Sequence, residues 1–86
     1  MTPEDIIAER AKTHGDYSVT ASIAQSLKRQ MRAAVGWHKF SAIQQDASEA
    51  IQGKLARALS GDPNAIDHWR DIAGYAQLVV DDLEGR

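Results

Sequence analysis

Residues 54–79 read KLARALSGDPNAIDHWRDIAGYAQLV, and this stretch decides the fold. On both sides of SGDPN, apolar residues recur at three- and four-residue spacing, which indicates two amphipathic helices. Gly61 closes the first helix, and Asp62 with Pro63, or Asn64, opens the second. The stretch therefore predicts two antiparallel helices joined by a tight break.

Two more helices are expected before this hairpin. The first begins at Thr2, because Pro3 suits the first helical position and Asp5 stands at capping-box spacing. It stops at Gly15, a residue that tolerates the left-handed conformation. The second covers about residues 18–35, where apolar side chains form one stripe. No segment has the alternation of a strand.

The segment GWHKF separates the second expected helix from the third. Gly36 ends the second helix, and Trp37 and Phe40 are expected to pin the turn to the core. The third helix opens at Ser41, with Gln44 at capping-box spacing. The fold class is therefore all-α: a compact antiparallel hairpin or bundle of about four helices.

Length and composition favour a single small domain, residues 1–86, that assembles with itself. The chain has no cysteine, and a domain of this size without disulfides or metal often gains stability by forming oligomers. A net charge of -2 argues against DNA binding. We expect no signal peptide, no membrane span and a cytoplasmic location.

Two glycines interrupt otherwise strong helices. Gly53 and Gly74 each cost roughly 1 kcal/mol relative to alanine in a helix interior. Close approach of two helices, within one protomer or between protomers, is the expected compensation.

Asp67 and Asp71 lie one turn apart on the last expected helix. Such a pair is typical of a magnesium or manganese site, since Mg²⁺ prefers oxygen ligands. The alternative is that these carboxylates form ion pairs and orient Arg70, Arg57 or Lys54.

The first turn, His14 to Tyr17, is a candidate ligand site. A planar side chain beside Gly15 suits a nucleotide base and its phosphate, and Lys28 supplies counter-charge. The alternative is that Tyr17 is a core aromatic and His14 a surface residue.

Two segments, ERAKTHGDY near the start and residues 54–79, together resemble a family of small phage proteins, the type 2 anti-CBASS cyclic-nucleotide sponges. The resemblance implies a hexamer that sequesters cyclic dinucleotides such as 3′,3′-cGAMP, and in some members cyclic trinucleotides. It implies no hydrolysis, no cofactor, and action in the cytoplasm of the infected bacterium.

The resemblance also implies which residues bind each ligand. For the cyclic dinucleotide these are a stacking residue (His14 or Tyr17), the adjoining Gly15, Lys28 and Gln30. For the cyclic trinucleotide they are Arg57 and the loop amides of Gly61 and Asn64, at a helix start where phosphate binds favourably.

Residues 54–79 also resemble the MazG-like all-α nucleotide pyrophosphohydrolases, which bind magnesium through acidic pairs on two helices. Here three carboxylates remain for such a site, Glu49, Asp67 and Asp71, and Gln52 stands where a further acid is expected. Lysine and arginine bind phosphate directly without activating water. The exchange of acids for bases favours a binding protein, with the magnesium-dependent enzyme as the alternative.

Overall fold

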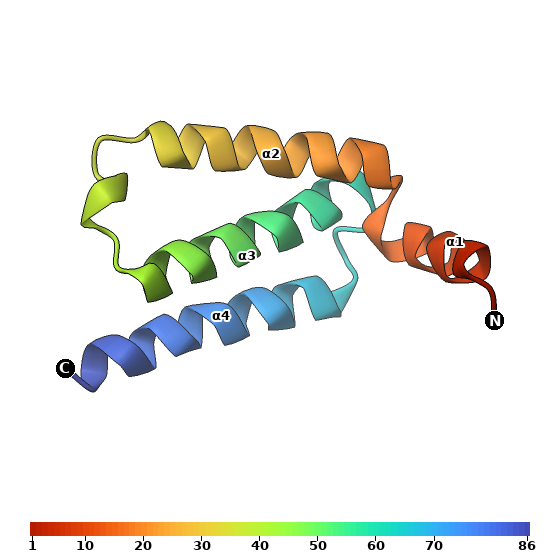
Figure 1. The fold of residues 1–86 in the computed structure, drawn as a ribbon. Helices are drawn as coiled ribbons and strands as arrows, with labels where there is room; N and C mark the ends of the chain where they lie inside the picture. Colours follow the sequence, from red (N-terminus) through yellow and green to blue (C-terminus); the bar gives the residue numbers. More distant parts are fainter.

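The computed structural model describes residues 1–86 and is entirely helical. Its helices are α1 (Pro3–His14), α2 (Tyr17–Ala33), α3 (Ala42–Ser60) and α4 (Ile66–Glu84), with a short 3-10 turn, η1 (Trp37–Lys39), between α2 and α3 (Figure 1). The prediction of four helices and no strand is confirmed.

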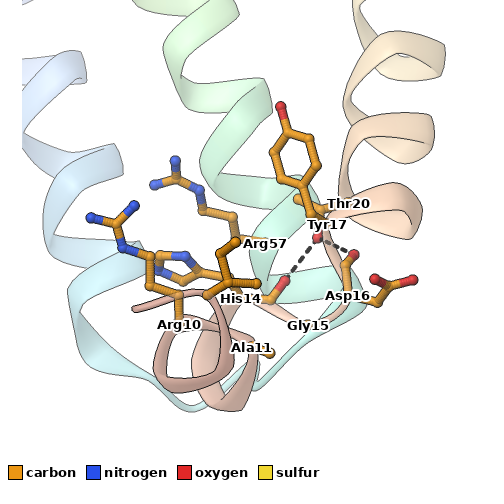
Figure 2. A pocket seen from close by; sticks show the side chains of 9 residues that line it. Arg10, Ala11, His14, Gly15, Asp16, Tyr17, Thr20 and Arg57 are labelled. Carbon is orange, nitrogen blue, oxygen red and sulfur yellow. Dashed lines mark hydrogen bonds between the residues drawn. The ribbon is translucent and has the colours of Figure 1, made fainter. Parts of the chain in front are cut away.

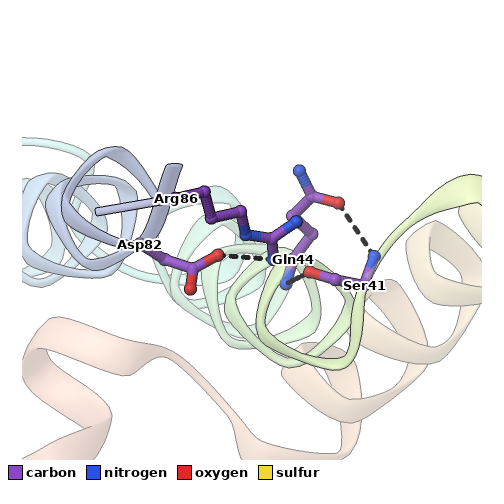
Figure 3. Close-up of polar contacts among 4 residues, drawn as sticks. All are labelled: Ser41, Gln44, Asp82 and Arg86. Atoms are coloured by element: carbon purple, nitrogen blue, oxygen red, sulfur yellow. Dashed lines mark hydrogen bonds and ion pairs between the residues drawn. The ribbon is translucent and has the colours of Figure 1, made fainter. Parts of the chain in front are cut away.

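The helix starts at Thr2 and Ser41 are both fixed by capping boxes, as predicted. The Thr2 hydroxyl accepts from the Asp5 amide and the Asp5 carboxylate accepts from the Thr2 amide, each at 3.1 Å. The Ser41 hydroxyl accepts from the Gln44 amide at 3.2 Å, and the Gln44 side chain accepts from the Ser41 amide at 2.8 Å (Figure 3). Such caps contribute about 1 kcal/mol each.

Other predicted helix ends were wrong by a few residues. The fourth helix begins at Ile66, because the Asp62 carboxylate accepts from the Asn64 amide at 2.9 Å and the Asp62 carbonyl accepts from the Ala65 amide at 3.2 Å. These bonds hold the segment in a turn that competes with the helix. At the end of α2 the helix stops at Ala33, and Gly36 instead starts η1.

Helices α2, α3 and α4 lie side by side in an open antiparallel layer (Figure 1). The middle helix, α3, packs against both neighbours, whereas α2 and α4 make next to no contact with each other. Helix α1 lies at one end of the layer and contacts the others only sparsely. At the opposite end of the layer α3 starts at its Ser41 cap and α4 ends, where the Arg86 guanidinium pairs with the Asp82 carboxylate at 2.7 Å (Figure 3).

An open layer leaves little of the chain buried. Only six residues are buried, namely Thr20, Ala24, Ala47, Ala56, Ala58 and His68. No large apolar side chain is fully buried, and Phe40, expected to pin the η1 turn to a core, packs on Trp37 with ring centroids 5.4 Å apart while remaining exposed. The buried apolar residues are therefore all alanines, and larger ones between the helices, such as Leu27, Leu55 and Ile72, are only half-buried.

Two glycines permit a close crossing of the main chain. Gly15 has φ of 77°, and a Cβ there would overlap the backbone of Ser60. A Cβ on Gly61 would overlap the backbone of residues 13–15. In contrast, nothing lies within 4 Å of a Cβ built on Gly53 or Gly74. The expected close helix approach within the protomer is thus wrong for both of these helical glycines.

Candidate functional site

The end of α1 is tied to the α3–α4 loop by hydrogen bonds to main-chain oxygens. The Thr13 carbonyl accepts from the Asp62 amide and from His68 Nε2, each at 2.9 Å. Because a carbonyl only accepts, His68 carries its proton on Nε2. His68 is 3% exposed, so this bond satisfies a buried polar group.

Two hydroxyl groups complete this junction. The Thr20 and Ser60 hydroxyl oxygens both lie 2.8 Å from the His14 carbonyl oxygen and 2.5 Å from each other. They come from α2 and α3, so one carbonyl at the end of α1 binds both helices. The junction therefore fixes where the His14 side chain and the Gly15 turn lie.

A cavity of about 640 Å³ opens beside the junction (Figure 2). Its lining comes from α1, the Gly15 turn, α2 and α3: Ile7, Arg10, Ala11, His14, Gly15, Asp16, Tyr17, Thr20 and Arg57. Tyr17 is 79% exposed, so its ring is free to contact a ligand. The interpretation of Tyr17 as a core aromatic is therefore wrong for the isolated chain.

The cavity is electropositive on one side. Arg10, Arg57 and the His14 ring gather there, apart from the Tyr17 ring (Figure 2). Neither guanidinium forms an ion pair or a side-chain hydrogen bond within the chain. Two unpaired guanidiniums, each with a planar fork of donors, suit the binding of phosphate or carboxylate groups.

The surroundings of His14 disfavour its protonated form. Partial burial lowers its pKa below the ordinary value of 6.5, and the nearby positive charge of Arg57 lowers it further. His68, Lys54 and Arg10 act in the same direction. The His14 and His68 rings lie 5.3 Å apart between centroids, tilted by 46°. A neutral imidazole offers a ligand one donor, one acceptor and a flat face.

The structure groups the predicted dinucleotide and trinucleotide residues differently from the sequence. His14, Gly15 and Tyr17 lie together, and Arg57, assigned to the other site, lies with them. Lys28 lines a second cavity of about 440 Å³, together with Asp46, Glu49, Ala50, Gly53, Lys54, Arg57 and Tyr75. Arg57 therefore borders both cavities. Gln30, Gly61 and Asn64 line neither of them.

The loop amides expected to meet phosphate are already occupied. The Gly61 amide donates to the Arg57 carbonyl and the Asn64 amide to the Asp62 carboxylate, each at 2.9 Å. Because α4 begins only at Ile66, neither amide is an open helix start, and their contact with a cyclic trinucleotide stays a prediction.

The carboxylates of the alternative metal site each meet a cation. Asp71 lies 3.2 Å from the Lys54 ammonium, and Asp67 lies 3.9 Å from the Arg70 guanidinium. The expected pairing of these aspartates with basic side chains is confirmed. Glu49 forms an ion pair with Arg32. No group of three or more histidine or carboxylate side chains in the chain is placed to hold a metal ion.

Arg10, Asp46 and Thr20 line the cavities but were not among the predicted site residues. Arg10 stands four residues before His14, a spacing that places both on one helix face. Asp46 stands three residues before Glu49, and both line the second cavity. No local sequence pattern indicated a role for Thr20, because that role depends on its contact with Ser60, forty residues away.

Comparisons with known protein families, with curated proteins and with solved structures find no match. No helix is long and apolar enough to cross a membrane. The fold and the site therefore define a small all-α protein with an arginine-lined cavity, and any function has to be argued from that cavity.

Proposed function

We propose that this protein binds and sequesters cyclic oligonucleotides, without hydrolysing them, and so suppresses CBASS immunity during phage infection. The observation that carries the proposal is the cavity in which Arg10 and Arg57, both unpaired, lie beside His14, with Tyr17 on another side of the lining. A cyclic dinucleotide carries two phosphodiesters and two bases. Guanidiniums bind phosphodiesters, and aromatic faces stack on bases.

The size of the cavity suits such a ligand. Small-molecule sites commonly enclose about 300–1,000 Å³, and this cavity has about 640 Å³. Its openness to solvent and the exposure of Tyr17 leave room for a neighbouring protomer to complete it. We propose that the protein acts as a homo-oligomer, a hexamer by resemblance to the sponge family, in the cytoplasm of the infected cell.

The proposal treats the cavity as one site for phosphate, in place of separate dinucleotide and trinucleotide sites. Arg57 borders the cavity that holds His14 and the cavity that holds Lys28. Arg57→Ala is therefore expected to weaken the binding of cyclic dinucleotides and of cyclic trinucleotides by similar factors. A charged hydrogen bond contributes about 1.5–3 kcal/mol, which corresponds to a loss of about 10- to 150-fold.

A second candidate, magnesium-dependent nucleotide pyrophosphohydrolysis, has one observation in its favour. Asp46 and Glu49, three residues apart on α3, line the second cavity beside Lys28 and Lys54. Carboxylates so placed hold Mg²⁺ in phosphate-cleaving sites. Against it, Glu49 is paired with Arg32 and no third metal-binding group joins the pair.

One experiment separates the two functions. The purified protein is incubated with 3′,3′-cGAMP and Mg²⁺, then denatured, and the released nucleotide is analysed by chromatography and mass. Intact nucleotide recovered from a tight complex supports sequestration. Cleaved product, or pyrophosphate release from nucleoside triphosphates with no cGAMP binding, contradicts it. Arg29→Ala, which changes an exposed cation outside both cavities, is the matched control for Arg57→Ala.

A further inference from the structure

Helix α4 carries an apolar stripe that nothing in the chain covers. Its members recur with spacings of 3, 4, 3, 4 and 3 residues and are all exposed: Ile66, Trp69, Ala73, Ala76, Val80 and Leu83. The four large ones are 57%, 46%, 43% and 48% exposed in chain order. This spacing is that of the seam along which two helices pair.

The stripe lies on a different side of α4 from its contact with α3. The least exposed α4 residues are His68, Ile72, Tyr75, Val79 and Asp82. At about 100° per residue their centre lies about 100° around the helix from the centre of the stripe. The Trp69 indole N–H donates to the Pro63 carbonyl at 2.8 Å, so covering its ring leaves no unpaired donor.

The size of the molecule shows how much surface the isolated chain leaves uncovered. A compact monomer of 9.4 kDa exposes about 5,000 Å², whereas this chain exposes 6012 Å². Its radius of gyration is 14.6 Å, against about 12 Å for a compact domain of the same length. The excess is what an open helical layer with an uncovered seam produces.

We propose that the α4 stripe pairs antiparallel with the same stripe of a second copy. The stripe has large residues at both ends and two alanines in the middle. Antiparallel pairing sets Ile66 against Leu83 of the second copy and Trp69 against Val80. Ala73 then meets Ala76 at a two-fold axis, where the small side chains let the helices approach closely. The stripe alternates the two apolar positions of a heptad repeat, a and d. In antiparallel helix pairs an a position of one helix faces a d position of the other in this way.

Charge favours the antiparallel direction. The end of α4 carries Asp81, Asp82 and Glu84, while its first half carries Arg70 between Asp67 and Asp71, of which Asp71 is paired with Lys54 of α3. Parallel pairing places the acidic ends of two copies together. Antiparallel pairing brings Arg70 alongside Asp81 and Glu84 of the second copy and also opposes the two helix dipoles. The partner that fits this surface is therefore the α4 helix of another copy of the chain, running antiparallel.

The absence of cysteine makes the direction directly testable. The double variant Ile66→Cys, Leu83→Cys and each single variant are oxidised mildly and run on a non-reducing gel. Within one helix these positions lie about 25 Å apart, too far for a disulfide. We expect a covalent dimer from the double variant alone. Cross-linking of either single variant indicates parallel pairing and overturns the proposal, as does no cross-linking in any variant.

A second pair of variants tests the seam without cysteine. Ala76→Glu places a charge at the proposed axis and is expected to reduce the mass in solution, measured by light scattering, by at least half. Leu78→Glu alters an apolar residue that is 58% exposed but lies off the stripe, and it is expected to leave the mass unchanged. Circular dichroism checks that both variants remain helical. An unchanged mass for Ala76→Glu overturns the proposal.

This inference rests on the self-association in the proposed function but not on the ligand. Cross-linking and mass are measured without nucleotide, and 3′,3′-cGAMP binding is measured separately on the wild-type chain. A chain that pairs through α4 without binding 3′,3′-cGAMP contradicts the sequestration proposal alone. A chain that binds it without the α4 pairing contradicts this inference alone.

Discussion

A Gly15→Ala substitution tests whether the crossing of Gly15 and Gly61 holds the site in place. Gly15 has φ of 77° and ψ of -171°, a region essentially restricted to glycine, and an alanine forced into it costs about 1–3 kcal/mol. The added Cβ also overlaps the Ser60 backbone. Relief of that overlap moves α1 away from the α3–α4 loop.

The movement breaks hydrogen bonds that can be counted. The Thr13 carbonyl loses its bonds from the Asp62 amide and His68, and the His14 carbonyl loses its bonds from two hydroxyls. At about 0.5–1.5 kcal/mol net per bond, loss of even one or two raises the total cost to roughly 1.5–6 kcal/mol. A chain of 86 residues has about 4–13 kcal/mol of stability in all.

Urea denaturation at one fixed protein concentration measures this cost, since self-association makes stability depend on concentration. The matched control is Gly74→Ala, where nothing lies within 4 Å of the new Cβ. The control is expected to stabilise the helix by up to about 1 kcal/mol. If the free energy of unfolding of Gly15→Ala lies within about 0.5 kcal/mol of the wild-type value, the proposed role of the crossing is refuted.

Three further outcomes follow from the junction and the cavity. First, the lowered pKa of His14 means that the unfolded chain binds a proton more readily, so stability is expected to fall as the pH drops through 6.5. Urea midpoints of wild type and His14→Gln compared between pH 7.5 and 5.5 check this, and an equal fall in both contradicts it. Second, a bound phosphate favours protonated His14, so the affinity for 3′,3′-cGAMP, measured by calorimetry, is expected to rise over the same drop in pH, and not in His14→Gln. Third, Thr20→Val keeps the side-chain shape but removes one hydroxyl from the His14 carbonyl, at a cost of about 1–3 kcal/mol in urea denaturation; no loss indicates that Ser60 alone satisfies that oxygen.

What the sequence predicted well depends on contacts between near neighbours. The capping boxes at Thr2 and Ser41 join residues three apart, so their side-chain types alone indicate a helix start. The same locality explains an error: Asp62 also bonds to a near neighbour, and the turn it forms delays α4 to Ile66.

The cavity could be predicted only in part for the same reason. His14, Gly15 and Tyr17 are contiguous, so the first turn was visible as one unit. Arg57 joins them because the α3–α4 loop crosses the end of α1, a contact between residues more than forty positions apart. The sequence around Arg10 is that of an ordinary polar helix face, and only the crossing of the main chain places Arg10 beside the cavity.

The crossing of Gly15 and Gly61 also separates the frame of the site from its lining. The frame consists of main-chain atoms, two glycines without side chains, the Thr20 and Ser60 hydroxyls and the His68 imidazole. Arg10 and Tyr17 take no part in any of those hydrogen bonds. If the proposed function holds, exchanging either one is expected to change which anion or base is preferred while the cavity keeps its outline, so that one scaffold could accept different ligands through changes in its lining alone.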